Sequence, residues 1–362
     1  MPDDVPRTLA DLTPSWLSSA LDTTVTDAVV TPIAEGEGFM GRLARVEPSY
    51  GDGGRGPASM IAKIPTDDPN SVAIGQMLRV WEREASFYRE LAPKLPVRTP
   101  RCHYAGGDPD SGIFALLLED LAPYDSGDQL IGASPAQAEA AIDWLGRFHA
   151  AESGEGHSAG MEWLPATATS PMYQGLGPML EAVWPAFVDK FGALAPPGTL
   201  GWVERMIPRW NESMASHYLA PTLVHADFRV DNLFFDRGDG RGGDRTVIAL
   251  DWQSIAHGEG LYDVAYFLGG SLPTEQRRAT EHDLVRRYGR VLRENGAPDV
   301  PGDDELFDHY RRCVLMAMTV GALLMGQLDL SVNQRAVDLA NAATERIYTT
   351  GKDLAVDQLI ED

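Results

Sequence analysis

The chain has 362 residues, of which 44% are hydrophobic and 23% charged, a balance typical of globular proteins. This length exceeds what a single hydrophobic core usually supports, so two lobes are expected. The net charge of −23 argues against nucleic acid or an anionic membrane surface as a partner, because both would repel the chain. The two cysteines, Cys102 and Cys313, lie far apart and predict reduced core thiols in a cytoplasmic protein.

Residues 27–121 predict strands separated by glycine-rich turns. The strand-like segments are "VVTPI", "RLARVEP", "SMIAKIP", "RCHYAG" and "IFALLLEDL". One helix, over residues 71–95, interrupts them, because its apolar residues recur near helical spacing. Residues 1–121 are therefore expected to form an N-lobe, an antiparallel β-sheet with one main helix.

Residues 122–362 predict a mainly helical C-lobe. A helix begins after Ser134, a favourable N-cap, with Pro135 at its first position. Helical patterns return over residues 178–191, 200–218 and from 260 onward, with breaks near 272–273 and 295–302. The segments "NLFFD" and "TVIALD" flank the turn-rich "RGDGRGGDR" and predict an inserted β-hairpin. The expected class is α+β, and no segment is long and apolar enough to predict a membrane span or a signal peptide.

Polar residues gather just before this hairpin, in "LVHADFRVDNLFF". His225, Asp227 and Asn232 follow the order H-x-D-x-x-x-x-N, and Asp251 ends the strand of "VIALDWQ". A carboxylate at the mouth of a loop can accept a proton from a hydroxyl, and an amide with a second carboxylate can bind Mg²⁺. This is the spacing of a kinase catalytic loop and its metal-binding aspartate. Alternatively, these residues only shape a turn and cap a strand.

Lys63 lies inside the apolar strand "SMIAKIP", where an ammonium group needs a counter-ion. The following helix offers Glu82, Glu84 and Glu90. We expect Glu84 to be the partner, with Glu82 as the alternative, and the pair to direct the ammonium toward the phosphates of ATP. The other interpretation places Lys63 in solvent on an edge strand.

Gly36, Gly38 and Gly41 in "EGEGFMG" form G-x-G-x-x-G. A dinucleotide-binding turn has the same pattern but opens a helix, whereas a strand-like segment follows here. A loop over phosphates between two strands is therefore favoured. The segment "LLLEDL" predicts a hinge in which Glu119 and Leu121 offer main-chain groups to the nucleotide base, or else a simple core strand.

Together these segments resemble the aminoglycoside-phosphotransferase-like family of small-molecule kinases, and within it the ecdysteroid-kinase-like and choline-kinase-like branch. The resemblance extends over residues 36–268. It implies a bilobal protein-kinase-like fold and transfer of the γ-phosphoryl group of ATP, with Mg²⁺, to an alcohol group of a small molecule. The missing A-P-E segment makes protein substrates unexpected.

The resemblance also implies roles for single residues. They are Asp227 as catalytic base, Asn232 and Asp251 as magnesium ligands, and Lys63 with Glu84 as the phosphate-orienting pair. Asp263 corresponds to an aspartate that supports the catalytic loop, or else it is a charge near a helix N-terminus that complements the helix dipole. His225 is expected to hold the loop backbone. Members of this branch often read H-G-D, whereas Ala226 stands here, a substitution that is conservative in size.

The acceptor stays open at this point: an aminoglycoside, a choline-like cation, a sugar, or a steroid-like or macrolide-like alcohol. Its contacts are expected from residues 154–171 and from the helices past residue 268. Six aromatic residues either surround an alkylammonium group or belong to the core: Trp163, Tyr173, Trp184, Trp202, Trp210 and Trp252.

Two other functions compete with a kinase. A metal-dependent hydrolase would use His225, Asp227, Asp251 and His257, but it leaves Lys63 unexplained. A nucleotide-binding pseudokinase would keep the fold without catalysis. The sequence does not indicate an oligomeric state.

Overall fold

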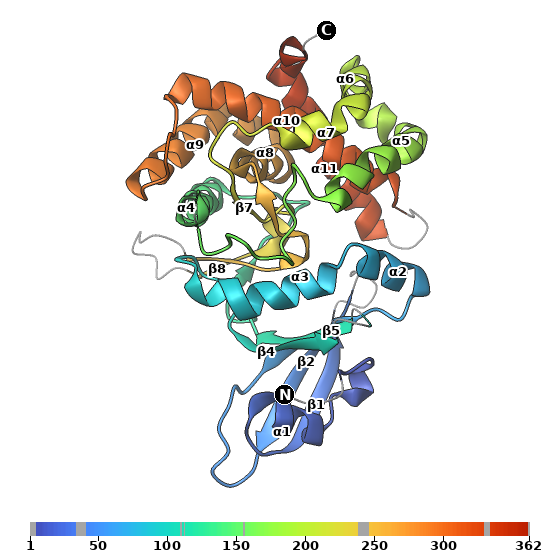
Figure 1. Ribbon diagram of the computed structural model, residues 1–362, viewed down its shortest axis with the longest axis vertical. Helices are drawn as coiled ribbons and strands as arrows, with labels where there is room; N and C mark the ends of the chain where they lie inside the picture. The colour runs from blue at the N-terminus through green and yellow to red at the C-terminus, as the bar shows by residue number, and fades with distance from the viewer. Residues whose placement is uncertain are drawn as a thin grey trace. The chain divides into compact units, whose positions relative to one another are not determined.

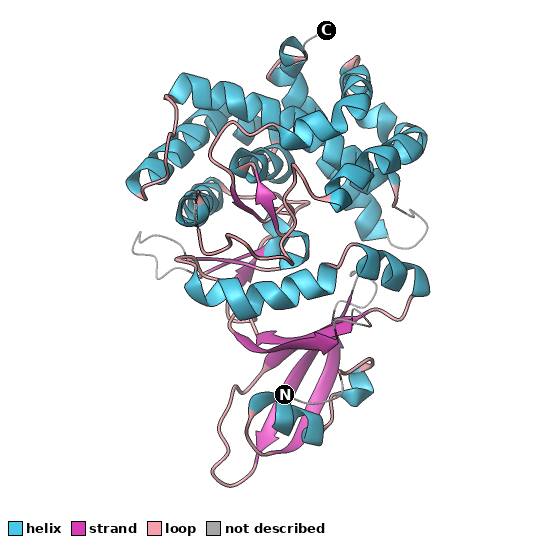
Figure 2. Cartoon of the chain, in the orientation of Figure 1, coloured by secondary structure: helices cyan, strands magenta, loops and turns pink. Residues whose placement is uncertain are grey.

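The computed structural model describes residues 5–33, 41–108, 111, 113–154, 156–237, 246–328 and 334–360 (Figure 1). The chain divides into two compact units. Unit 1 comprises Met1–Lys94, Thr99–Tyr124 and Leu250–Ser254, and unit 2 comprises Leu95–Arg98, Asp125–Ala249 and Ile255–Asp362. Unit 1 carries the larger sheet and unit 2 most of the helices (Figure 2), which confirms the α+β class. The lobe boundary after residue 121 stays a prediction.

The sheet of unit 1 is antiparallel, with the strand order β1-β2-β3-β5-β4. Its strands are β1 (Val25–Ile33), β2 (Gly41–Tyr50), β3 (Met60–Pro65), β4 (Cys102–Asp108) and β5 (Ile113–Glu119). Within β3, Lys63 lies opposite Leu43 of β2 and Leu116 of β5. Lys63 is therefore on an interior strand, and the edge-strand interpretation is wrong.

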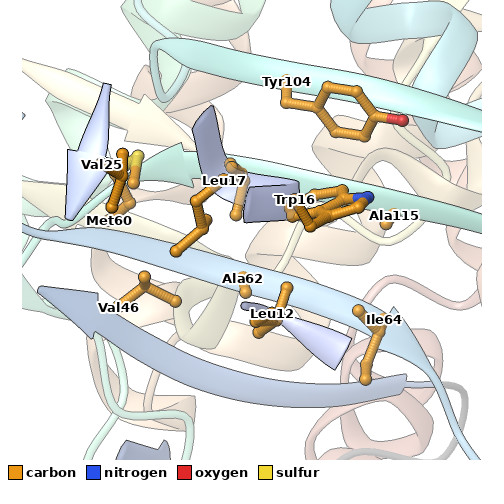
Figure 3. Packing of buried hydrophobic residues seen from close by; sticks show 11 residues of the cluster. Leu12, Trp16, Leu17, Val25, Val46, Met60, Ala62, Ile64, Tyr104 and Ala115 are labelled. Atoms are coloured by element: carbon orange, nitrogen blue, oxygen red, sulfur yellow. The ribbon is translucent and has the colours of Figure 1, made fainter. Parts of the chain in front are cut away.

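One face of this sheet carries the core of unit 1 (Figure 3). Trp16 packs there edge-on against Tyr104, with ring centroids 5.1 Å apart. Trp16 belongs to α1 (Pro14–Leu21), which follows the 3₁₀ turn η1 (Leu9–Asp11). The sequence analysis did not assign α1, although Thr13 accepts a hydrogen bond from the Trp16 N–H as an N-cap. Alternation along β3 buries Ala62 in this core and turns Lys63 to the other face.

The prediction of a single helix over residues 71–95 is wrong, because the helix is interrupted within this range. The segments are α2 (Pro69–Met77), α3 (Val80–Ser86), a π-helical turn η2 (Phe87–Leu91) and a 3₁₀ turn η3 (Ala92–Lys94). Arg79 takes φ +52° at the break. The Trp81 ring packs against Gly75, where a Cβ atom would lie 2.6 Å from the ring. After the break, α3 contacts β4 and β5.

Unit 2 contains two small sheets and eight described helices. One sheet has the order β6-β8-β9, with β6 (Asp125–Ser126), β8 (Leu233–Phe235) and β9 (Val247–Ala249), and the other pairs β7 (Thr222–Val224) with β10 (Ala256–Gly258). The helices are α4 (Pro135–Glu152), α5 (Pro171–Phe191), α6 (Thr199–Met206), α7 (Trp210–Ala215), α8 (Gly260–Ser271), α9 (Thr274–Glu294), α10 (Asp303–Gly326) and α11 (Gln334–Asp353).

Two helix predictions in unit 2 need correction. The helix expected from residue 178 begins at Pro171, a residue favoured at the first helical position. The helix expected over residues 200–218 is broken by the 3₁₀ turn η5 (Ile207–Arg209), because Pro208 has no N–H to donate. Short 3₁₀ turns also occur at η4 (Gly192–Leu194), η6 (Val230–Asn232), η7 (Trp252–Ser254) and η8 (Val356–Leu359). In the described part of the chain, every helix is too short or too polar to cross a lipid bilayer.

Candidate active site

The loop between β7 and β8 is anchored by a carboxylate from α8. Asp263 is fully buried and accepts two main-chain N–H groups, from His225 at Oδ2 (2.7 Å) and from Ala226 at Oδ1 (2.9 Å). Ala226 takes φ +63°, a left-handed conformation that favours glycine. Its replacement of glycine is therefore conservative in size but not in backbone conformation.

The Asp227 carboxylate is held by donors on both of its oxygen atoms. The Asn232 amide nitrogen donates to Oδ2 at 3.0 Å and to the Asp227 main-chain oxygen at 2.9 Å. Tyr266 Oη donates to Oδ1 at 3.1 Å, and Arg229 Nε lies 3.5 Å from the same atom. The Asp227 side chain still keeps 21% of its surface exposed. A fixed and partly accessible carboxylate can accept a proton from a bound hydroxyl.

His225 lies inside this loop and not at its surface. Its side chain is fully buried, and Nδ1 accepts the main-chain N–H of Asp227 at 3.3 Å. The imidazole ring also meets Phe228 edge-on, with centroids 5.7 Å apart. These contacts make His225 a part of the loop framework.

The structure adds three residues that the sequence analysis missed. Tyr266 and Arg229 contact Asp227, and His149 of α4 lies with Nε2 3.3 Å from Asp263 Oδ2. A signal existed for two of them. Tyr266 stands three residues after Asp263 in a predicted helix, and Arg229 two residues after Asp227. No local pattern indicated His149.

In unit 1, Lys63 lies between two carboxylates. Its Nζ is 2.7 Å from Glu84 Oε2 and 2.7 Å from Asp251 Oδ1. Burial alone would lower the pKa of Lys63, but the charges of Asp251 and Glu84 outweigh it and raise this pKa. Lys63 therefore stays cationic. Glu82, the alternative partner, instead pairs with Arg79.

The segment that carries Asp251 is anchored by aromatic stacking. The Trp252 ring lies parallel to that of Phe87, with centroids 3.8 Å apart and an interplanar angle of 12°. Asp251 itself takes φ +66°, and Gln253 Nε2 donates to its Oδ2 at 3.3 Å.

Burial raises the pKa of Glu84, and the charge of Asp251 adds to this while Lys63 opposes it. The two carboxylates of Glu84 and Asp251 thus share the one ammonium group of Lys63.

The expected nucleotide-binding residues are only partly described. Gly36 and Gly38 lie outside the described residues. A Cβ atom on Gly41 would lie 3.1 Å from the Ile64 carbonyl oxygen and 3.6 Å from the Lys63 side chain, so β2 approaches Lys63 closely. In the expected hinge, the Glu119 carboxylate accepts the Arg101 N–H at 2.9 Å. Leu121 is buried, and its carbonyl oxygen accepts the Tyr124 N–H at 2.9 Å.

The other candidate groups are placed as follows. Three of the six aromatic residues are core residues: Trp202, Trp210 and Trp252. His257 lies in β10, where its main chain bonds to Pro165 and Thr167. Within the described ranges, His, Cys, Asp and Glu side chains do not gather in threes at a spacing that would hold a metal ion.

Comparisons with known proteins give one family and one fold. The sequence pattern of the phosphotransferase enzyme family matches residues 51–299. A search of curated protein sequences gives no match.

Three solved structures share the fold at low sequence identity. The GDP complex of wild-type aminoglycoside 2′-phosphotransferase-IIIa is 13% identical, with a TM-score of 0.54 over 94% of this chain and 99% of that one. The GDP and kanamycin complex of aminoglycoside 2″-phosphotransferase-IIIa is 15% identical, with a TM-score of 0.53 over 94% and 97%. Choline kinase from Cryptosporidium parvum Iowa II is 10% identical, with a TM-score of 0.54 over 96% and 94%. Because the family match covers most of the sequence, the chain belongs to the phosphotransferase enzyme family and is a small-molecule kinase.

Proposed function

We propose that this enzyme transfers the γ-phosphoryl group of ATP, in the presence of Mg²⁺, to a hydroxyl group of a small molecule in the cytoplasm. The observation that carries the proposal is the Asp227 carboxylate. It accepts hydrogen bonds from Asn232 and Tyr266, and its side chain keeps 21% of its surface exposed. The loop that carries it is fixed by hydrogen bonds to Asp263. This is the arrangement that a positioned general base requires.

In the proposed reaction, Asp227 orients the acceptor hydroxyl and accepts its proton. As the acceptor oxygen bonds to the γ-phosphorus, the bond from that phosphorus to the bridging oxygen breaks, and ADP leaves. Asn232 and Tyr266 keep the carboxylate aimed, so most of the rate gain comes from positioning and electrostatics. His225 maintains the loop and does not carry the proton.

Lys63 is proposed to bind the phosphates of ATP, held by Glu84. Its retained positive charge between two carboxylates supports this role. Gly36, Gly38 and Gly41 would cover the phosphates with main-chain N–H groups, and main-chain groups of Glu119 and Leu121 would meet the base. These nucleotide contacts rest on the sequence resemblance.

Asn232 and Asp251 are proposed as the magnesium ligands. The amide nitrogen of Asn232 is bonded to Asp227, so its carbonyl oxygen is the atom offered to a cation, and Asp251 supplies a carboxylate. Such oxygen donors suit Mg²⁺, which when bound offsets the charge of the phosphates. The two residues belong to different units, so their joint role rests on the resemblance.

For the acceptor, the fold neighbours that bind kanamycin or act on choline support a hydroxylated cation. The net charge of −23 is compatible with such a molecule. The resemblance to the ecdysteroid-kinase-like branch supports a neutral polycyclic alcohol as the second class. The acceptor can be found by measuring ATP consumption over sugars, amino alcohols, aminoglycosides, macrolides and sterols.

The decisive variant is Asp227→Ala. We expect kcat to fall ~10²–10⁴-fold, the usual contribution of positioned proton transfer, while ATP affinity is kept. Asp283→Ala, which changes an exposed aspartate on α9, is the control and should keep the parental rate. Phosphorylation by Asp227→Ala at the parental rate would refute the proposal. Metal-supported turnover without nucleotide would favour the hydrolase, and ATP binding without turnover of any acceptor would favour the pseudokinase.

A further inference from the structure

Helix α8 carries a second tyrosine beside the one that contacts Asp227. Tyr262 and Tyr266 stand four residues apart, so they lie on one side of the helix. Their rings are stacked, with centroids 5.8 Å apart and an interplanar angle of 23°. Tyr266 donates to the Asp227 carboxylate, and Asp263, which anchors the loop, directly follows Tyr262. Tyr262 is thus a neighbour of the proposed base.

The hydroxyl group of Tyr262 is buried and unused. The side chain is 7% exposed, and Oη is enclosed without a hydrogen-bond partner among the described residues. Burial raises the pKa of Tyr262 well above its ordinary value, and Tyr266, Asp263 and Asp227 add to this. The group therefore stays a neutral hydroxyl that can donate or accept. Native proteins rarely leave such a group unpaired, because the missing hydrogen bond destabilises them.

We propose that Tyr262 determines acceptor specificity: its hydroxyl binds a second hydrogen-bonding group of the acceptor, next to the hydroxyl that is phosphorylated. This inference rests on the proposed function and deepens it. A diol or an amino alcohol gives Tyr262 its missing partner, whereas an alcohol with one polar group leaves it unpaired in the complex. A site with a built-in polar group discriminates strongly in this way.

Tyr348 of α11 provides a matched control. It is also buried, and its hydroxyl also lacks a hydrogen-bond partner in the described part of the chain. Burial alone raises the pKa of Tyr348, with no contribution from Asp227 or Tyr266. Removing this hydroxyl therefore tests the loss of a buried, unpaired group away from the proposed base.

The test measures ATP turnover with matched probes: 2-aminocyclohexanol and cyclohexane-1,2-diol against cyclohexanol. The parental enzyme should prefer the first two, with kcat/KM about tenfold higher, the size of one good hydrogen bond. Tyr262→Phe should abolish this preference mainly through KM and should unfold at the same or a higher temperature. Tyr348→Phe should keep the preference. Saturable protection of the parental enzyme against thermal unfolding by cyclohexane-1,2-diol, lost in Tyr262→Phe, gives a readout without turnover.

Two results would overturn the inference. One is the same acceptor preference in the parental enzyme and in Tyr262→Phe. The other is turnover of cyclohexanol, or of another alcohol with one polar group, while every diol and amino alcohol is refused. Failure of the proposed function would look different: Asp227→Ala would retain turnover, whatever Tyr262→Phe does.

Discussion

The carboxylate of Asp263 accepts the main-chain N–H of His225 at 2.7 Å, although the two residues are 38 positions apart. Its second oxygen takes the N–H of Ala226. One fully buried side chain of α8 therefore fixes the backbone from which Asp227 projects. Through these contacts, a fully buried residue of α8 helps to position the proposed base.

Asp263→Asn should lower both stability and activity. The amide keeps one acceptor oxygen but places an NH₂ group against a buried N–H. We expect the free energy of unfolding to fall by about 1–3 kcal/mol, and kcat to fall at least tenfold as Asp227 loses its position. Urea unfolding and steady-state kinetics measure the two effects. Asp283→Asn, at an exposed site, is the control, and equal behaviour of the two variants would rule out the anchoring role.

Ala226→Gly should stabilise the protein. Ala226 takes φ +63°, which costs an L-residue about 1–2 kcal/mol, while glycine loses more chain entropy on folding. The net gain in the free energy of unfolding should be about 0.5–1 kcal/mol, measured by urea unfolding. Ala265→Gly in α8 has no such conformation to relieve and should destabilise. A loss of stability in Ala226→Gly would show that the loop relaxes elsewhere.

Glu84→Gln should weaken the use of ATP, whereas Glu82→Gln should not. Glu84 is the buried partner of Lys63, while Glu82 pairs with Arg79. The Gln amide oxygen can still accept from Lys63, but the negative charge is lost, and weakening this charge-assisted hydrogen bond should lower kcat/KM for ATP on the order of tenfold. Initial rates at varied ATP concentrations decide this. If both variants have the same kcat/KM for ATP, the role of Lys63 in ATP use does not depend on Glu84.

Tyr266→Phe should lower kcat with little change in the KM for ATP. The variant removes the hydroxyl that donates to Asp227 Oδ1 at 3.1 Å. Because this bond goes to a carboxylate, the loss in kcat should be about tenfold or more. Comparing the pH profile of kcat between the parental enzyme and Tyr266→Phe shows whether Tyr266 also influences the ionisation of Asp227. An unchanged kcat over the whole profile would leave Tyr266 as a structural residue only.

His217 should make the fold sensitive to mild acid. Burial lowers the pKa of His217 below 6.5, and the neighbouring His257 lowers it further. The unfolded chain therefore takes up protons first as the pH falls. The contribution of neutral His217 to the free energy of unfolding is complete above pH 6.5. It is lost as the pH falls toward and through the pKa of His217 in the folded state.

The test compares urea unfolding of the parental protein and His217→Gln between about pH 7.5 and 5.5, on either side of the ordinary histidine pKa. The parental protein should lose more stability over this range. Burial also lowers the pKa of His257, opposed by Glu152, so part of the acid sensitivity should remain in the variant. His282→Gln on the exposed side of α9 is the control. If the free energy of unfolding depends on pH in the same way in the parental protein and in His217→Gln, His217 is excluded as a source of the acid sensitivity.

Much of the fold follows from local pattern. Segments rich in β-branched or alternating apolar residues indicated all five strands of the first sheet, and Ser134 with Pro135 marked the start of α4. Breaks inside helices were harder to predict. The one at Arg79 lies beside the contact of Trp81 with Gly75, which a periodic pattern does not show, whereas Pro208 was a visible signal that went unused.

The sequence by itself determined the chemical inventory of the site, because the spacing of His225, Asp227 and Asn232 is set by neighbouring residues of one loop. The pairing of Lys63 with Glu84 was also expected, since a lysine in an apolar strand needs an anion. Only the tertiary structure decided which distant groups complete these clusters. Tyr266 reaches Asp227 across 39 positions, and His149 meets Asp263 across 114. Such contacts depend on how helices and strands pack, and packing is a property of the folded chain that no local spacing encodes.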